Sequence, residues 1–323
     1  MSQHVIRSIT PDEAAIYRRD GVVQLRGVLS LRAVNQLRGA IDAALHTSVD
    51  SASAYDLTRL VKAIDDDDLD SLNDLCDGQY DIKVIAELVK ASGAQTLRDD
   101  DADSTGAYHL DSGVAARLRA FKDFCLNTSL GELAGGIMSC DQIRFYDDQI
   151  FVKEPGCLER TAYHQDSTYF HLEGDQTCVM WIPVDPANEV TGAIRYLRGS
   201  HKWGVDYKPN VFVAATPFPN AEGEELPDQD TLDNDPRVVQ FECEPGDVII
   251  HHYKTVHGAG GNHHQYQVRR AASLRYCGED MRYLHRPYAP PQAHHTHNLE
   301  DGDPIETDCF PLIWSRPDQA EAA

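Results

Sequence analysis

Hydrophobic residues recur at helical spacing in the first part of the chain. Thr10-Pro11-Asp12-Glu13 is a helix start signal, because threonine can cap a helix and proline fits its first position. After Ser30, the segment LRAVNQLRGAIDAAL places apolar residues every three or four positions, which predicts an amphipathic helix. A further helix is expected over 82–91, and residues 21–25 have the pattern of a short strand. We therefore expect a mainly helical N-terminal portion over about residues 1–140.

From about residue 140 the pattern changes to short runs of strand-forming residues separated by turn residues. The expected strands lie at 143–153, 177–184, 193–197, 238–242, 248–252 and 270–277. Many short strands with turns between them predict an antiparallel barrel or jelly roll. The acidic, proline-rich stretch at 218–236 is expected to be a surface insertion. The C-terminal tail is expected to be irregular apart from an apolar patch at 310–314.

Composition narrows the possible partners and the compartment. The chain has 323 residues and a formal net charge of −23, so phosphate backbones and anionic lipid are poor partners. Its eight cysteines are scattered without a CxxC pair, which favours reduced thiols in a cytoplasmic protein. No signal-peptide pattern and no apolar run long enough for a membrane span are apparent. The Asp run at 65–68 is interpreted as a solvated loop.

The candidate chemistry begins with His164-Gln165-Asp166. In an extended segment, His164 and Asp166 point to the same side, so an imidazole and a carboxylate can grip one ion. His257 follows a later expected strand and can supply a third ligand. Two histidines and one carboxylate with open positions are the pattern of non-haem Fe(II) oxygenases. An HxD pair alone is common by chance, so its sequence context decides the interpretation.

That context is an ordered set of motifs: QIFVKEPG at 149–156, HQD at 164–166, TGAIRYLRGSHK at 191–202, PGDVII at 245–250 and HGAGGN at 257–262. The set resembles the phytanoyl-CoA dioxygenase family of Fe(II)/2-oxoglutarate-dependent oxygenases. The resemblance runs from about Asp12 to Tyr276 and is loose over 50–140. It implies a mostly β fold with flanking helices around a double-stranded β-helix core, of the jelly roll or cupin-like type, at about 141–280. We expect one such domain over 1–323.

The resemblance also implies roles for individual residues. His164, Asp166 and His257 would bind iron, and Arg269 would bind the distal carboxylate of 2-oxoglutarate as a bidentate pair. Arg270 is the adjacent competitor, but alternation turns only one of the two arginines inward. The other residues implied for the cosubstrate pocket are Gln149, Trp181 and Lys153, and a surface ion pair is an equal alternative for Lys153.

Three further positions refine the expected chemistry. Some relatives have a serine two residues after the distal histidine, where this chain has Ala259. Halogenating relatives replace the carboxylate with a small residue, so Asp166 favours hydroxylation. Tyr169 and Phe170 follow the HQD motif and are expected to contact the substrate.

The expected function is hydroxylation of a small organic molecule at a C–H bond, with Fe(II), 2-oxoglutarate and O2, releasing succinate and CO2. The alternatives are a cupin-like metalloenzyme that does not use 2-oxoglutarate, and a non-catalytic ligand-binding barrel. The partner is a small-molecule substrate, with no nucleic acid and no membrane.

The remaining histidines are expected to matter less. His251 and His252 are neighbours in one expected strand, so at most one can face the site. His294, His295 and His297 form an HHxH cluster that we expect to lie in a solvated tail.

Overall fold

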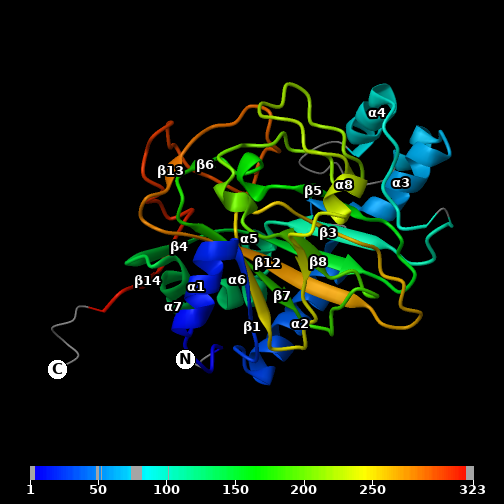
Figure 1. Ribbon diagram of the computed structural model, residues 1–323. Helices are drawn as coiled ribbons and strands as arrows, with labels where there is room; N and C mark the ends of the chain where they lie inside the picture. Colours follow the sequence, from blue (N-terminus) through cyan, green and yellow to red (C-terminus); the bar gives the residue numbers. More distant parts are fainter. Residues whose placement is uncertain (1–3, 49–50, 52, 74–81, 101, 318–323) are drawn as a thin grey trace.

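Strands from both halves of the chain build one large antiparallel sheet in the computed structural model, which describes residues 4–48, 51, 53–73, 82–100 and 102–317 (Figure 1). Its strand order is β1-β10-β7-β12-β4-β3-β2, and β14 also pairs with β4. The bounds are β1 Val22–Leu25, β2 Ala54–Asp56, β3 Tyr108–Ser112, β4 Gln142–Lys153, β7 Thr177–Pro183, β10 Val248–His252, β12 Arg269–Cys277 and β14 Leu312–Ser315.

A smaller sheet with the order β5-β11-β8-β9 forms the second layer of strands. It consists of β5 Thr161–His164, β8 Ile194–Leu197, β9 Val238–Gln240 and β11 His257–Ala259. The short strands β6 Leu172–Glu173 and β13 Arg282–Tyr283 pair separately. The predicted strands from residue 143 to residue 277 are all present within a few residues of their expected bounds, and the jelly-roll expectation is confirmed.

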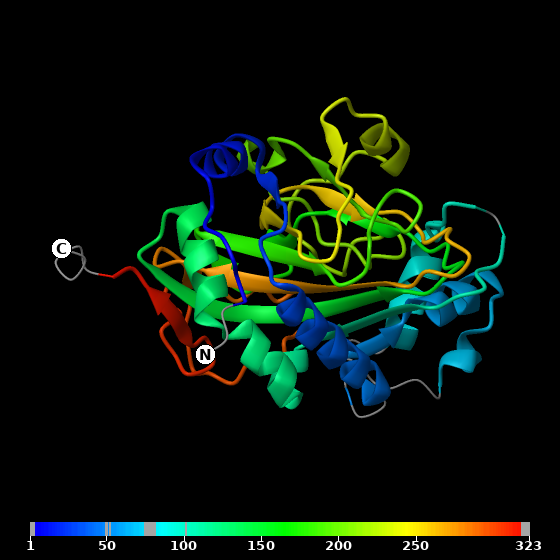
Figure 2. The same ribbon diagram turned by 90° about the horizontal axis from the view of Figure 1, so that it is seen from below.

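Helices cover one face of the large sheet, as Figure 2 shows from below. They are α2 Leu31–His46, α5 Val114–Arg117, α6 Arg119–Cys125 and α7 Thr128–Met138, and α1 Pro11–Asp20 packs beside them against β1 and α7. The helices α3 Leu57–Asp65 and α4 Ile82–Ser92 belong to a separate core cluster, and α8 Gln229–Asp233 lies against β5 of the smaller sheet. Short 3₁₀ turns lie at η2 Leu69–Leu72, η3 Asp166–Thr168 and η4 Ser200–Lys202. Thr10 and Glu13 form a reciprocal capping box at α1, as the start signal predicted.

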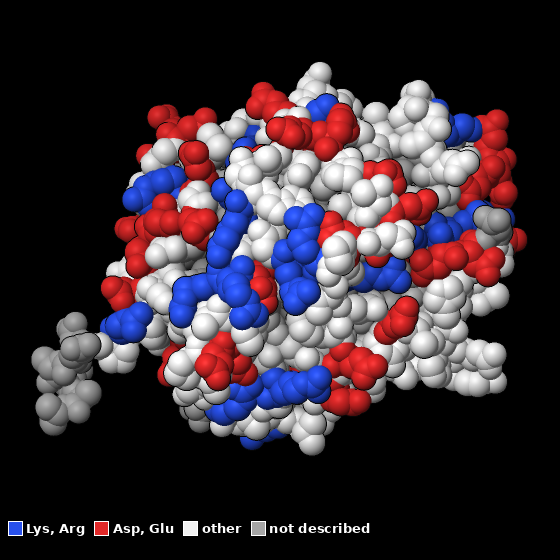
Figure 3. All heavy atoms as spheres, in the orientation of Figure 1, with Lys and Arg blue, Asp and Glu red and all other residues white. Residues whose placement is uncertain are grey.

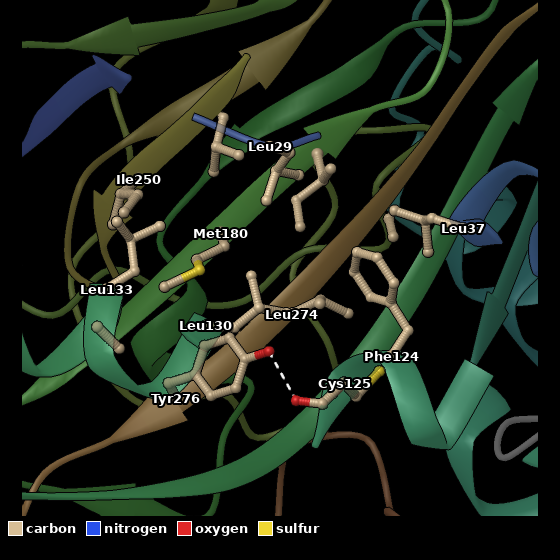
Figure 4. Packing of buried hydrophobic residues seen from close by; sticks show 14 of the residues in the cluster. Leu29, Leu37, Phe124, Cys125, Leu130, Leu133, Met180, Ile250, Leu274 and Tyr276 are labelled. Carbon is tan, nitrogen blue, oxygen red and sulfur yellow. Dashed lines mark hydrogen bonds between the residues drawn. The ribbon is translucent and has the colours of Figure 1, made fainter. Parts of the chain in front are cut away.

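The main core lies between these helices and the covered face of the large sheet. Leu37 of α2 and Phe124 of α6 pack in one cluster with Met180, Ile250 and Leu274 from the strands (Figure 4). All five side chains are buried. Because alternate residues of a strand point to opposite faces, burying one face against helices leaves the other face of the sheet to line a site.

The structure adds strand pairings at both ends of the chain. In the mainly helical N-terminal portion, β1 forms at the short strand expected over 21–25, and β2 and β3, which were not expected, join the same sheet. In the tail, the apolar patch contains most of β14, which pairs with β4 and packs its side chains against α7. The partners of these strands lie far away in the sequence, so local pattern alone did not reveal the pairing.

The surface does not carry one uniform sign of charge. Figure 3 shows Lys and Arg side chains near the middle of one face, with Asp and Glu side chains spread around them. The net charge of −23 is therefore an average over mixed surfaces. Among the described residues, no helix has the length and apolar character needed to cross a membrane.

Candidate metal and cosubstrate site

Strand pairing brings the three predicted metal ligands together. His164 ends β5, and it lies directly opposite His257 of β11 in the antiparallel ladder. Asp166 follows at the start of η3, so the extended geometry continues only through Gln165. The distance from His164 Nε2 to Asp166 Oδ1 is 3.7 Å, and that from His257 Nε2 to Asp166 Oδ2 is 3.9 Å. All three side chains are buried, and one ligand atom from each lies within 4.8 Å of the others.

Hydrogen bonds hold both imidazoles in the form that a metal requires. Nδ1 of His164 lies 2.8 Å from the Ala162 carbonyl oxygen, and Nδ1 of His257 lies 2.9 Å from that of Thr255. Because a carbonyl only accepts, each Nδ1 carries a hydrogen, which leaves Nε2 as the ring atom that can bind a metal. Burial, followed by the neighbouring His257, lowers the pKa of His164 to about 3, so its imidazole is neutral. Two imidazoles that present Nε2 and one carboxylate fit a divalent ion such as Fe(II).

A third buried histidine contacts the carboxylate. His251 of β10 is 1% exposed, and its Nε2 donates to Asp166 Oδ2 at 3.0 Å. Burial opposes ionisation of Asp166, but His257 and the hydrogen bond from His251 outweigh it and hold the pKa of Asp166 well below its usual range. His252, the next residue, binds the Asp175 carbonyl oxygen instead. Alternation predicted that only one of these neighbours faces the site, but not its contact with Asp166.

An inner cavity of about 30 Å³ extends from the triad along the inside of the sheets. Arg269 lines it and is 2% exposed, with only long hydrogen bonds to the Thr191 and Gly192 carbonyl oxygens at 3.5 Å and 3.2 Å. Burial lowers the pKa of this guanidinium. Within the described part of the chain, Arg269 makes no ion pair with a carboxylate. A buried cation with no anion beside it is suited to binding one.

Arg270 has the opposite environment. Its side chain forms ion pairs with Asp185 at 2.8 Å and with Asp42 of α2 at 2.7 Å. The structure thus turns Arg269 into the inner cavity and Arg270 toward the helix layer, as strand alternation requires.

The other predicted cosubstrate residues divide into two groups. Gln149 and Trp181 line the inner cavity, and the Gln149 side chain joins Ser112 and Arg275 by hydrogen bonds of 3.0 Å and 2.7 Å. Lys153 is fully buried outside this lining, where Nζ donates to the Glu159 and Gly260 carbonyl oxygens at 2.6 Å and 2.7 Å. Burial lowers the pKa of Lys153 to about 7. Its ammonium group thus binds two carbonyl oxygens outside the cavity lining, and the alternative of a surface ion pair is excluded because Lys153 is buried.

Two hydroxyl groups in the inner cavity were not predicted. The Tyr108 hydroxyl and Thr161 Oγ1 lie 2.8 Å apart and both residues line the cavity, as does Ala259. These two hydroxyls can form hydrogen bonds with a ligand in the cavity that Ala259 lines, and Ala259 stands where some relatives have a serine. Both come from strands that are distant from HGAGGN in the sequence, so no local signal pointed to them.

An outer cavity of about 130 Å³ meets the inner one at Gln149, Asp166 and Arg275. Tyr169 and Phe170, the expected substrate contacts, line this cavity. Its apolar side chains come mainly from α3, α4 and loops, and include Leu57, Leu60, Ile85, Val211, Phe212 and Phe218. The tail closes one side with Pro290, Gln292 and His294. The expected solvated position of the HHxH cluster is therefore wrong for His294 and His295, whose side chains are 15% and 7% exposed.

Two β-sheets of this topology around a buried pair of histidines and a carboxylate define a double-stranded β-helix protein of the cupin-like oxygenase class. The chain belongs to the phytanoyl-CoA dioxygenase (PhyH) family, whose model matches residues 17–271.

Comparison with curated proteins gives partial matches. A probable phytanoyl-CoA dioxygenase of Caenorhabditis elegans is 31% identical over 127 residues, which cover 39% of each chain. A probable alpha-ketoglutarate-dependent hypophosphite dioxygenase of Stutzerimonas stutzeri is 29% identical over 144 residues, covering 43% of this chain and 47% of that protein. The matched part of the chain thus spans less than half the length of these relatives.

Solved structures match over nearly the whole chain. The non-haem alpha-ketoglutarate-dependent carbocyclase SnoK from nogalamycin biosynthesis has a TM-score of 0.59 at 21% identity, covering 94% of this chain and 96% of that one. EctD from S. alaskensis with 2-oxoglutarate and 5-hydroxyectoine has a TM-score of 0.60 at 16% identity, covering 98% and 92%. At these identities the likeness establishes the fold.

Proposed function

We propose that this protein is an Fe(II)- and 2-oxoglutarate-dependent dioxygenase that hydroxylates a small organic molecule and releases succinate and CO2. One observation carries the proposal: the buried triad of His164, Asp166 and His257 shares a cavity with Arg269, a buried cation that has no carboxylate partner among the described residues. A metal site alone would not require that cation. A 2-oxo diacid needs both, because one end chelates the metal and the other carries a free carboxylate.

The chain's own residues hold and orient the reactants. His164 and His257 would present Nε2 to iron, while His251 holds the second oxygen of Asp166 in place. Arg269 would grip the distal carboxylate of 2-oxoglutarate, with Trp181, Gln149 and the Tyr108 and Thr161 hydroxyls around it. When bound, iron and 2-oxoglutarate supply the O2 activation that oxidises a C–H bond. Asp166 occupies one ligand position, which favours hydroxylation over halogenation.

The outer cavity supports a compact and largely apolar substrate. An engineered apolar cavity of about 150 Å³ accommodates benzene, so about 130 Å³ suits a group near the size of one six-membered ring. Arg275 is the one Lys or Arg side chain among the residues lining it. A coenzyme A thioester, with several phosphates, would therefore find few charge partners here. Tyr169 and Phe170 would contact the substrate near Asp166.

We further propose that residues 1–323 form one cytoplasmic domain. Strands β1, β2 and β3 of the N-terminal portion belong to the same sheet as the core strands, which supports a single unit. Seven described cysteines have free thiols and six of them are buried, which is in keeping with a reducing compartment.

The test needs no knowledge of the natural substrate. Anaerobic addition of Fe(II) and 2-oxoglutarate should produce the visible absorption of an Fe(II)–2-oxo acid chelate, and admitting O2 should yield succinate. Both signals should be lost in His164→Ala and Asp166→Ala while the fold persists by circular dichroism. Full signals in both variants would refute the proposal. Metal binding with turnover independent of 2-oxoglutarate would select the cupin-like alternative, and metal binding without any turnover would select the binding protein.

A further inference from the structure

A second cluster of potential metal ligands lies at the far side of the outer cavity. Asp147 is on β4, and His294 and His295 are in the tail segment that precedes β14. His294 Nε2 lies 2.7 Å from Asp147 Oδ1, and His295 Nε2 lies 3.9 Å from the same oxygen. One ligand atom from each residue lies within 4.8 Å of the others, the same limit that describes the first triad. No residue belongs to both clusters.

His295 gives an independent reason to expect a ligand here. Its side chain is only 7% exposed, and its ring packs edge-on against Tyr146 and Phe310 at centroid distances of 5.0 Å and 4.9 Å. These contacts fix the ring with Nε2 directed toward Asp147. Among the described residues, this nitrogen has no hydrogen-bond partner. Leaving a buried polar atom without a partner is destabilising, and a bound ion would supply that partner.

We propose that Asp147, His294 and His295 bind a divalent metal ion of the borderline class, such as Zn²⁺, at a site separate from the proposed iron site. Two imidazoles and one carboxylate are a common ligand set for such ions, with water or a substrate oxygen completing the coordination. Asp147 and His294 line the outer cavity, so those remaining positions would face the space where the substrate is expected.

The charged groups around this cluster are the carboxyl group of Asp148 and the guanidinium of Arg275. In the absence of metal, His294 donates to Asp147, and an ion would replace that proton. Asp148, the next residue, is buried and accepts hydrogen bonds from the Val114 and Ala115 amides at 2.7 Å and 3.1 Å. Asp148 therefore has its own partners and is not one of the three ligands.

The site would fasten the tail to the large sheet. Pro290 and Gln292 belong to the same tail segment and line the outer cavity. Gln292 also accepts a hydrogen bond from the Tyr146 hydroxyl at 2.8 Å. An ion that joins His294 and His295 to β4 would thus hold the wall that these residues form. This ion would shape the substrate cavity without binding 2-oxoglutarate.

The experiment counts metal ions in the full chain. Metal-depleted protein is dialysed against buffered Zn²⁺, and bound zinc is measured by elemental analysis. We expect two equivalents in the wild type, one in His295→Gln, one in His257→Ala and none in the double variant. His297→Gln is the matched control, because His297 is in the same HHxH motif but outside the cluster, and it should keep two.

Several outcomes overturn the proposal. One equivalent in the wild type that His295→Gln retains and His257→Ala loses, or two equivalents in His295→Gln, would show that the second cluster binds no ion. An equivalent that persists in the double variant would place the binding elsewhere. If His295→Gln loses both ions, circular dichroism and the variant Asp147→Asn decide between misfolding and site loss: a folded Asp147→Asn variant that retains two equivalents overturns the site.

Discussion

The inner and outer cavities share three lining residues but are built differently. Every inner-cavity residue except Asp166 belongs to a strand of the two main sheets. The outer cavity takes most of its wall from α3, α4, the loop around Phe212 and the tail. Strands fix the position of a side chain through ladder hydrogen bonds, whereas connecting segments vary more freely. The difference indicates that the strands hold the residues that would bind the metal and the cosubstrate. The connecting segments form most of the surface that would select the substrate.

Replacing Arg269 is the strongest test of the inner cavity. Removing one partner of a buried charge pair costs about 2–5 kcal/mol, so Arg269→Met should weaken 2-oxoglutarate binding by roughly 30-fold or more. The affinity for Fe(II) should stay unchanged, because Arg269 is not one of the three ligands. Titration of the Fe(II)-loaded protein with 2-oxoglutarate measures both quantities.

Arg270→Met is the control for that substitution. It removes ion pairs to Asp185 and Asp42, so it should lower stability without changing the affinity for 2-oxoglutarate. If both variants lost 2-oxoglutarate binding equally, a specific contact between Arg269 and the cosubstrate would be contradicted.

His251 tests whether the second layer of contacts matters to the metal. Residues that hydrogen-bond to a metal ligand typically contribute 10–100-fold, so His251→Phe should lower Fe(II) affinity by about that factor. His252→Phe, in which the changed residue binds Asp175 instead of Asp166, should leave it unaltered. Anaerobic competition against a coloured chelator measures the affinity. Unchanged binding in His251→Phe would assign this histidine to packing alone.

A change in the outer cavity should have a smaller and more selective effect. Ile85→Ala enlarges that cavity from α4, far from the three ligands in sequence. One or a few methylenes in an apolar pocket are worth about 1–3 kcal/mol, so the KM of a compound that stimulates succinate formation should change by roughly tenfold or more. The KM for 2-oxoglutarate should not move. A parallel change in both values would contradict the division between the cavities.

Lys153→Met should have the smallest effect on ligand binding, because Nζ binds two carbonyl oxygens outside the inner cavity. We expect less than about a twofold change in 2-oxoglutarate affinity. A loss as large as that in Arg269→Met would instead return Lys153 to the cosubstrate site.

The same variant should reveal a pH effect on stability. The pKa of Lys153 is lowered to about 7 in the folded protein, below the value of about 10.4 in an unfolded chain. Between these values the unfolded chain binds more protons, so this lysine makes the free energy of unfolding rise with pH. Urea unfolding at several pH values should show that rise in the wild type and a weaker one in Lys153→Met. Equal slopes would contradict the lowered pKa.

Sequence analysis was most successful where local pattern and chemistry coincide. The HQD motif and His257 follow from residue type and strand periodicity, and the structure brings His164, Asp166 and His257 together. Strand alternation predicted that only one of Arg269 and Arg270 points inward, and the family resemblance selected Arg269. The contact between His251 and Asp166 depends on how β10 lies beside the smaller sheet, which no local pattern encodes. The Tyr108–Thr161 pair and the burial of His295 likewise depend on long-range packing.

The direct pairing of His164 with His257 also has a consequence for biogenesis. During synthesis, the HQD motif leaves the ribosome well before β11, so a nascent chain has only two of the three ligands. Non-local strand pairing is slow relative to local structure, so the third ligand arrives late in folding. We therefore expect the metal to bind after the small sheet has formed. Metal binding would then follow the completion of folding and would not occur during translation.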